Sequence, residues 1–319
     1  MFVNILLLII GFIILIKGAD FFVDGASSVA SNLKVSKMVI ALTIVAFGTS
    51  APEFAVSMKS MISGSGELVL GNVIGSNIIN ILLILGISAI IRPLYVKSNT
   101  VKKELPILIM ITTLLVVVFC DSSISNIGVN TIARSDGIIL LLFFLIFIYY
   151  LFSAIRNRKD SSNDVPRFSM RKSILLSVFG ILAIVLGSQL VVDSSTEIAD
   201  FLGISERLIG LTIVALGTSL PELVTSVVAA KKNEIDLAVG NIIGSNIFNI
   251  GIVLALPVTI FGNVTPVGFN MLDIIVMIVS AVILFCFSAD DNKISRKEGI
   301  IMLILFILYY GHIIAEGVI

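Results

Sequence analysis

Residues 43–54 read TIVAFGTSAPEF, and residues 212–223 repeat this stretch almost unchanged as TIVALGTSLPEL. A second stretch, GNVIGSNIINI at residues 71–81, returns as GNIIGSNIFNI at residues 240–250. Both pairs are offset by 169 residues, which is the difference between positions 43 and 212 and between positions 71 and 240. Weaker similarities keep this offset, namely Gly18 with Gly187, Asp24 with Asp193, and Glu104 with Asp273. Self-similarity at one fixed offset indicates a duplicated architecture over nearly the whole chain.

Composition places both copies in a lipid bilayer. The 319 residues are 57% hydrophobic and 13% charged, and their mean hydropathy is +1.13. An ordinary soluble domain is much less apolar. The formal net charge is zero, which gives no indication of a nucleic-acid partner. The single histidine, His312, and two cysteines provide no cluster for a transition metal.

Ten stretches are long and apolar enough to cross the membrane as helices, since a span needs about 20 mainly apolar residues. The first has no basic leader, so we expect a retained spanning helix and not a removed signal peptide. The sequence therefore predicts an all-α membrane protein with ten transmembrane helices. The stretches are residues 2–24, 36–60, 68–91, 104–120, 136–154, 171–195, 205–230, 237–262, 270–288 and 297–316.

The duplication and the spans together predict two inverted repeats. Each half holds five spans, and because five is odd the second half must enter the membrane in the opposite orientation. We expect a first inverted repeat over residues 1–154, a cytoplasmic linker over residues 155–172, and a second inverted repeat over residues 173–319.

The basic residues predict the orientation. Of the 21 lysines and arginines, 17 fall in the loops after the odd-numbered spans. The positive-inside bias makes that side cytoplasmic, which leaves both termini outside the cell membrane. Cys120 and Cys286 then lie at opposite faces, and because a disulfide needs Cα atoms within about 7 Å we expect both to be free.

Two acidic residues, Glu53 and Glu222, lie inside the second and seventh predicted spans. A charge at mid-bilayer costs at least about 2.5–3.5 kcal/mol. No lysine or arginine lies at the matching depth of the second, third, seventh or eighth span, so bound cations are the expected compensation. The alternative is a pair of protonated structural carboxylates that hydrogen-bond to neighbouring helices.

Each glutamate follows a proline, Pro52 or Pro221, which in turn follows Gly-Thr-Ser and one apolar residue. Proline removes a helical hydrogen bond and obstructs the carbonyl four residues earlier, so we expect a kink there. A kink of this kind is often only structural. Together with an acidic residue it brings hydroxyls and freed carbonyls into the span, and such hard oxygen ligands suit Ca2+ and Na+. The hydroxyls belong to Thr49, Ser50, Thr218 and Ser219.

The Gly-Asn-x-x-Gly-Ser-Asn-x-x-Asn runs add further polar groups from the third and eighth spans. Ser76 and Asn80 are four residues apart and share a helix face, as do Ser245 and Asn249. One interpretation is helix association through small residues and amide hydrogen bonds. We favour ligand or supporting roles for these four residues and a packing role for the glycines.

The paired GTSxPE and GNxxGSN motifs resemble the alpha-1 and alpha-2 repeats of the sodium/calcium exchanger branch of the cation/Ca2+ antiporter superfamily, in its prokaryotic type. The resemblance covers the whole chain. It implies an alternating-access exchanger with ten spans, in which the first and sixth helices slide against the second, third, seventh and eighth. It also implies that Glu53 and Glu222 hold Ca2+ with carbonyls of Thr49 and Thr218. The sodium sites that it implies draw on Ala46, Ser50, Ser76, Ala215, Ser219 and Ser245.

Asn249 departs from this pattern, because several relatives, including potassium-dependent ones, carry aspartate at that position. The centre here has two carboxylates and two amides, which disfavours potassium co-transport. Only about 18 residues separate the fifth and sixth spans, which leaves no room for the large regulatory insert of animal exchangers.

The sequence thus predicts a secondary antiporter that exchanges Ca2+ for Na+, with the two ions and the bilayer as its partners. H+/Ca2+ exchange and K+-dependent Na+/Ca2+ exchange remain alternatives on the same scaffold. A Ca2+ channel is disfavoured, since inverted halves with broken helices are typical of carriers. We expect no enzyme activity, because no Ser/His or Asp/Asp catalytic set occurs within the spans, and no cofactor, nucleic acid or required protein partner.

Overall fold

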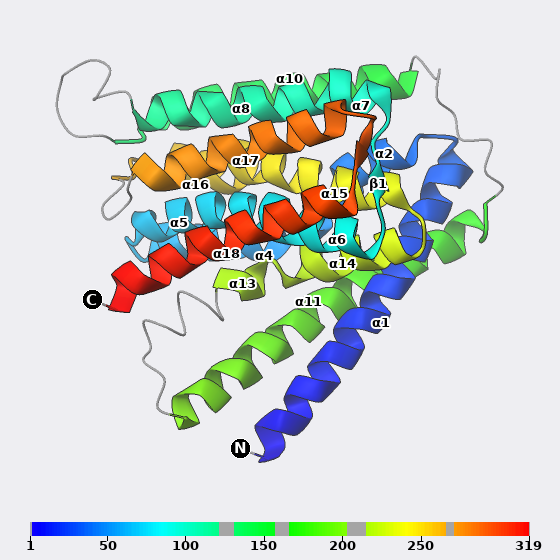
Figure 1. The fold of residues 1–319 in the computed structure, drawn as a ribbon, viewed down its shortest axis with the longest axis horizontal. Helices are drawn as coiled ribbons and strands as arrows, with labels where there is room; N and C mark the ends of the chain where they lie inside the picture. Colours follow the sequence, from blue (N-terminus) through cyan, green and yellow to red (C-terminus); the bar gives the residue numbers. More distant parts are fainter. Residues whose placement is uncertain (1, 121–130, 157–165, 203–214, 266–270, 319) are drawn as a thin grey trace.

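The computed structural model describes residues 2–120, 131–156, 166–202, 215–265 and 271–318, and these are almost entirely helical (Figure 1). Two short strands, β1 (Leu94–Tyr95) and β2 (Lys293–Ile294), pair antiparallel. In chain order the helices, with η for π-helical segments, are α1 (Phe2–Leu33), α2 (Lys37–Ile40), η1 (Ala41–Val45), α3 (Ala46–Thr49), α4 (Ala51–Ile62), α5 (Gly66–Ile78), η2 (Ile79–Leu85), α6 (Gly86–Ile91), α7 (Ser98–Lys102), α8 (Glu104–Phe119), α10 (Arg134–Arg156), α11 (Met170–Phe201), α13 (Ala215–Thr218), α14 (Leu220–Lys231), α15 (Ile235–Phe248), η4 (Asn249–Leu254), α16 (Ala255–Phe261), α17 (Met271–Ala289) and α18 (Arg296–Val318).

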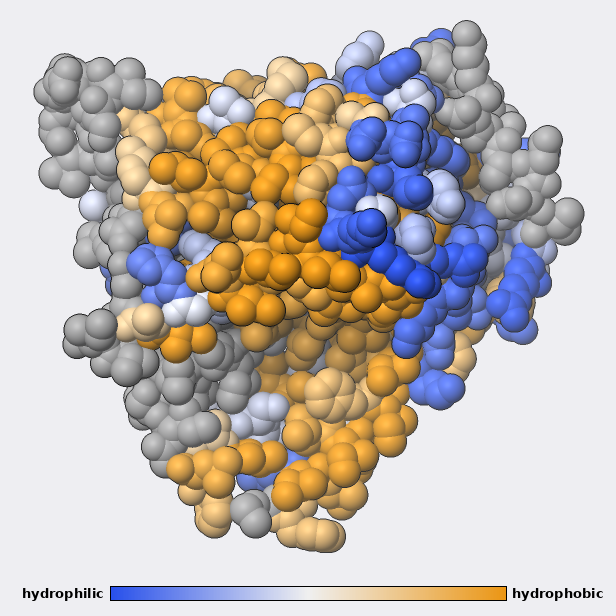
Figure 2. All heavy atoms as spheres, viewed as in Figure 1, coloured by the Kyte–Doolittle hydropathy of each residue, from blue (hydrophilic) through white to orange (hydrophobic). Residues whose placement is uncertain are grey.

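Seven helices of the described residues are long and apolar enough to cross a membrane. An eighth crossing is formed if the helices Lys37–Thr49 and Ala51–Ile62, which meet at 47°, count as one bent span. Apolar side chains cover most of the surface in Figure 2, while hydrophilic ones gather at the end near β1 and β2. The structure therefore agrees with a multi-pass helical membrane protein. The middle of the predicted linker, residues 157–165, lies outside the described residues.

The first and sixth predicted spans are longer in the structure than their apolar stretches. α1 continues to Leu33 and α11 to Phe201, so each has 32 residues. At 1.5 Å per residue such a helix measures about 48 Å, more than the roughly 30 Å of a hydrocarbon core. Hydropathy alone misses these extensions because their small and polar residues are stabilised by packing between the two helices.

α1 and α11 lie side by side and run obliquely to the other helices (Figure 1). Glycines bring their backbones together, since a Cβ on Gly180 would lie 2.5 Å from the Phe22 nitrogen. A Cβ on Gly187 would likewise lie 2.6 Å from the Leu15 nitrogen. Close backbone approach through small residues is a common basis of helix association in membranes. We call this helix pair the α1–α11 unit.

The centre of the molecule is formed by two helices that carry the Gly-Asn-x-x-Gly-Ser-Asn runs. The spans Gly66–Ile91 and Ile235–Phe261 are 72% and 78% buried in their most apolar windows, against 22% for α1, α10 and α18. Both contain π-helical segments, η2 and η4, which include the last asparagines of the runs, Asn80 and Asn249. Such turns occur often at functional sites because they reorient side chains within a helix.

The cysteines are free, as predicted. Cys120 follows α8, and its Sγ lies 3.9 Å from Sδ of Met271 at the start of α17. Cys286 lies 15 residues further along that helix, which places it about 22 Å away.

Candidate cation-binding site

Two helix breaks, at Ser50 and Ser219, organise the site. Their backbone angles are nearly the same, with φ −84° and ψ 8° at Ser50 and φ −87° and ψ 4° at Ser219. Each serine precedes a new helix with proline in its first turn, where a missing N–H costs nothing. The predicted kinks are thus confirmed at the first break by the 47° bend.

Glu53 and Glu222 occupy the first turns of α4 and α14, and both are only 1% exposed. Ser50 donates a 2.8 Å hydrogen bond from Oγ to Oε1 of Glu222. Ser245 donates a second one, at 3.2 Å, to the same oxygen. Ser219, at the second break, donates in turn from Oγ to Oγ of Ser76 in the first half at 3.4 Å. Each break therefore directs its hydroxyl to a polar side chain of the other half.

Among the buried oxygens of the described residues that have no hydrogen-bond partner, four belong to predicted site residues: Oε2 of Glu53 and Glu222, and Oδ1 of Asn80 and Asn249. Each of these four residues is 1% exposed. α4, which carries Glu53, packs against η4, and α14, which carries Glu222, packs against η2. A buried acceptor without a donor is expensive. Oxygens of this kind, gathered from several helices, suit Na+ or Ca2+ as ligands.

Two asparagines that the sequence analysis did not select accept hydrogen bonds from the amides of this oxygen set. Asn80 donates from Nδ2 to Oδ1 of Asn246 at 2.8 Å. Asn249 donates from Nδ2 to Oδ1 of Asn77 at 3.2 Å. Asn77 and Asn246 are the third letters of the two GSN motifs, so the repeated motif was the available signal.

Asn72 and Asn241, the first asparagines of the two runs, were missed as well. Asn72 donates to the Glu53 carbonyl at 2.9 Å and to Ser57 Oγ at 3.0 Å. Asn241 donates to Ser226 Oγ at 3.0 Å. These bonds tie α4 to α5 and α14 to α15, and the first of them fixes the backbone of a predicted ligand.

The remaining predicted residues lie around the same centre. Thr49 donates to Oδ1 of Asn241 at 3.0 Å and lies 3.4 Å from Oγ of Ser245. Ser76 accepts a 3.4 Å hydrogen bond from Ser219. The Ala46 carbonyl accepts from the Ser50 nitrogen at 3.0 Å.

In the second half, Ala215 and Thr218 begin and end α13, immediately before the break at Ser219. They therefore occupy the positions that correspond to Ala46 and Thr49 in the first half. The structure thus brings the predicted residues of both halves to the two helix breaks and the two central helices.

Fixed positive charges lie away from this centre. Among the described residues, the ion pairs join Lys17, Lys37, Lys97, Arg167 and Lys232 to Asp20, Asp24, Glu234 and Asp236, and none involves Glu53 or Glu222. The part of the chain that the structure describes also holds no group of three or more His, Cys, Asp or Glu side chains that could bind a metal. The oxygen set is therefore made of two carboxylates and neutral groups.

Comparison with known proteins gives consistent similarities. The profile of the sodium/calcium exchanger protein family matches residues 3–153 and 172–315. The sodium/calcium exchanger MaX1 of Methanosarcina acetivorans is 35% identical over 96% of this chain and 97% of its own length. The inner membrane protein YrbG of Escherichia coli is 34% identical over 95% of this chain and 94% of its own length. A solved structure of the sodium-calcium exchanger NCX_Mj, soaked with zero Na+ and Ca2+, superposes with a TM-score of 0.82 at 35% identity over 97% of this chain and 98% of that one.

Proposed function

The chain belongs to the sodium/calcium exchanger protein family, and we propose that it exchanges Ca2+ for Na+ across the cell membrane by alternating access. One observation carries the proposal: the buried acceptor oxygens of Glu53, Glu222, Asn80 and Asn249 have no donor among the described residues. Bound cations would give these oxygens the partners that the described residues lack. Two carboxylates balance one Ca2+ or two Na+, and the surrounding hydroxyls supply neutral ligands for either ion.

We propose that the metal ligands are those predicted from the sequence. Glu53 and Glu222 hold Ca2+, with the carbonyls of Thr49 and Thr218. Six further residues complete the sodium sites or orient their ligands through hydroxyls and amides, together with the carbonyls of Ala46 and Ala215. These six are Ser50, Ser76, Asn80, Ser219, Ser245 and Asn249.

Ten spans in two inverted five-helix repeats are part of the proposal. In this proposal the spans are the seven long helices, the bent second span, α8 with its 16 residues, and the broken segment α13–α14. Support for the repeat comes from equivalent residues with equivalent interactions. Asn72 bonds to Ser57 as Asn241 bonds to Ser226, each at 3.0 Å, and both members of each pair differ by 169 positions.

Alternating access needs a part that moves against the site. The α1–α11 unit is the best candidate, since its helices pack mainly on each other and leave many apolar side chains exposed. Two buried carboxylates without a cation repel each other and are poorly solvated, so closure around an empty site is unfavourable. This penalty couples the movement of one ion to that of the other.

The test is tracer Ca2+ uptake into proteoliposomes under imposed gradients. We expect an outward Na+ gradient to drive Ca2+ uptake in the absence of K+, and a pH gradient alone to drive none. Protons could also neutralise Glu53 and Glu222, which is why H+/Ca2+ exchange is the competing function. Robust uptake driven by protons in sodium-free buffer would establish that alternative. Uptake that requires K+ together with Na+ would indicate the potassium-dependent reaction.

A further inference from the structure

The side-chain amides at the centre form two hydrogen bonds that are equivalent by the repeat, and we call them the amide clasp. Asn80 donates to Asn246 at 2.8 Å, and Asn249 donates to Asn77 at 3.2 Å. Asn246 also donates to the Asn77 carbonyl at 3.2 Å. All four side chains are at most 2% exposed. The clasp therefore joins α5–η2 to α15–η4 in the middle of the molecule, without access to solvent.

A side-chain amide has one accepting and one donating end, so an acceptor placed beside its nitrogen favours the orientation that leaves its oxygen for a cation. In the clasp the nitrogens of Asn80 and Asn249 are both engaged, while their oxygens lack donors. We propose that Asn77 and Asn246 are positioning residues that select this amide orientation for cation binding. The proposal rests on the proposed function and assigns roles to two residues that do not themselves serve as ligands.

The experiment is a pair of crossed double-mutant cycles on Ca2+ affinity. Asn246→Leu is expected to weaken the apparent Ca2+ affinity about five- to tenfold, since it releases Asn80 and a hydrogen bond contributes roughly that factor. In Asn80→Ala the same substitution should have almost no further effect, because Asn246 acts through Asn80. In Asn249→Ala it should retain its full effect. Asn77→Leu should behave in the mirror-image manner, coupled to Asn249 and independent of Asn80.

Matched controls separate positioning from loss of packing. Ser88→Ala removes a buried hydroxyl without a partner from α6, which continues η2, and should leave affinity unchanged. Calcium binding by titration calorimetry, in addition to flux, keeps the test informative about binding itself. Additive effects of Asn246→Leu and Asn80→Ala in folded protein would overturn the proposal, whereas a wild-type protein that binds no Ca2+ would count against the proposed function.

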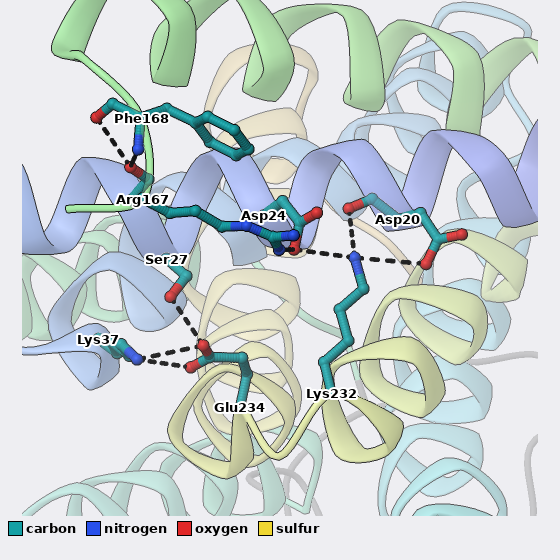
Figure 3. A network of polar contacts seen from close by, with 9 residues as sticks. Asp20, Asp24, Ser27, Lys37, Arg167, Phe168, Lys232 and Glu234 are labelled. Atoms are coloured by element: carbon teal, nitrogen blue, oxygen red, sulfur yellow. Dashed lines mark hydrogen bonds and ion pairs between the residues drawn. The ribbon is translucent and has the colours of Figure 1, made fainter. Parts of the chain in front are cut away.

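An independent observation concerns the polar end of the α1–α11 unit, where charged residues join it to the turn between α14 and α15 (Figure 3). Lys232 Nζ lies 2.9 Å from Asp24 Oδ1 and 3.4 Å from Asp20 Oδ1, and it donates a 2.8 Å hydrogen bond to the Asp20 carbonyl. Ser27 donates to Oε1 of Glu234 at 2.9 Å. These contacts, which we call the polar lock, connect the unit to the core.

The two helices of the unit are tied to each other at the same end. Asn32 donates to the Phe168 carbonyl at 2.8 Å, and Ser173 donates to Ser28 Oγ at 2.9 Å. Arg167, just before α11, lies 3.2 Å from Asp24. Movement of α1 and α11 together would keep these bonds and would have to break those of Lys232 and Ser27 to the core.

At the equivalent positions of the repeat only part of the polar lock keeps its charge, because Asp24 corresponds to Asp193 while its other charged residues have neutral counterparts. At an offset of 169 residues, Lys232 corresponds to Ser63 and Glu234 to Ser65, in the turn between α4 and α5. Asp20 corresponds to Gln189 on α11. Serine and glutamine cannot form ion pairs, and among the described residues the ion pairs between the unit and the core all lie at the end with Lys232.

The polar lock is built to open reversibly. The side chains of Lys232 and Asp24 are 26% and 24% exposed. Beside them is a hollow of about 290 Å3 lined by Asp24, Ser27, Ser28, Ser31, Lys37, Arg167 and Glu234. Water in this hollow can replace the partners when they separate, whereas breaking a fully buried ion pair would strand its charges.

We infer that the polar lock biases the exchanger toward the conformation described here, in which the α1–α11 unit is attached to the core at the face with most basic residues. The inference rests on alternating access in the proposed function and makes the two faces unequal. Removing Lys232 is expected to favour the other conformation about fivefold, which corresponds to about 1 kcal/mol for partly exposed ion pairs.

The test is a spin-label distance measurement across the opposite face. Cysteines at Ile62 and Leu202, both exposed, report the separation of α4 from the end of α11 in a background with Cys120 and Cys286 replaced by serine. Lys232→Gln should increase a second distance population about fivefold relative to the wild type. Lys232→Arg keeps the charge and should restore the original distribution. Glu234→Gln, which weakens the Ser27 contact, should shift the distances in the same direction.

Lys231→Gln is the matched control. Lys231 is the neighbour of Lys232 and its side chain is exposed, so the variant removes the same charge without breaking the polar lock. The measurement is made without Na+ or Ca2+ and so does not depend on which ion is transported. Distances in Lys232→Gln equal to those of the wild type, or an equal shift in Lys231→Gln, would overturn the polar lock and leave the proposed function untouched.

Discussion

The hydroxyl of Ser50 lies 2.8 Å from Oε1 of Glu222, although 172 residues separate the two along the chain. Ser50 belongs to the break in one half and Glu222 to the first helical turn after the break in the other. The first Gly-Thr-Ser segment therefore helps to build the site around Glu222, whose carboxylate accepts from Ser50 of the first half and from Ser245 of its own half.

Neutralising either carboxylate should abolish exchange. We expect Glu53→Gln and Glu222→Gln to lose nearly all Ca2+ transport. Both variants should remain folded, because no lysine or arginine in the described ion pairs uses Glu53 or Glu222 as its partner. Tracer flux and gel-filtration profiles of the purified variants measure the two properties. Glu67→Gln, at an exposed position of α5, is the control. Wild-type flux in either site variant would remove that residue from the site.

Removing the shared hydroxyl should weaken the site without destroying it. Ser50→Ala deprives Glu222 of a hydrogen bond, and bonds to charged groups contribute about 1.5–3 kcal/mol. We expect the apparent Ca2+ affinity to fall about tenfold or more. Ser288→Ala, which removes a buried hydroxyl without a partner, should leave it unchanged. Equal affinities in the two variants would show that the Ser50 bond does not support cation binding.

The α1–α11 unit should be sensitive to added volume at its glycines. A Cβ on Gly180 would lie 2.5 Å from backbone of Phe22, so Gly180→Val must push the helices apart. Overpacking of this kind costs about 1–3 kcal/mol, and we expect a lower melting temperature and slower exchange. A Cβ on Gly75 meets nothing within 4 Å, so Gly75→Ala serves as the tolerated comparison. Unchanged melting of Gly180→Val would contradict the described packing.

The distribution of basic residues predicts which face is cytoplasmic. A cysteine replacing Lys231 should resist an impermeant thiol reagent applied to intact cells, and a cysteine replacing Ile62 should react. Both side chains are exposed, so the difference reports the side of the membrane and not burial. The reverse pattern would invert the proposed orientation.

Much of this protein follows from sequence because bilayer and helix physics act on local patterns. Glu53 and Glu222 stand out since a charge in an apolar span needs compensation. The break near Pro52 follows from the missing proline N–H, and the structure places it at Ser50. The fixed offset between the two copies identifies equivalent residues, and these reach the same central region.

Partner choice was decided only by the tertiary structure. The offset indicates that Asn80 corresponds to Asn249, yet the bonds run instead to Asn246 and Asn77. Likewise, a lysine in a turn, such as Lys232, gives no indication of its partners in the sequence. Only the approach of α1 places it between Asp20 and Asp24. Sequence periodicity reports the surroundings that a side chain needs, while the identity of its neighbour depends on how whole helices pack, and that packing is a collective result of many contacts distant in the chain.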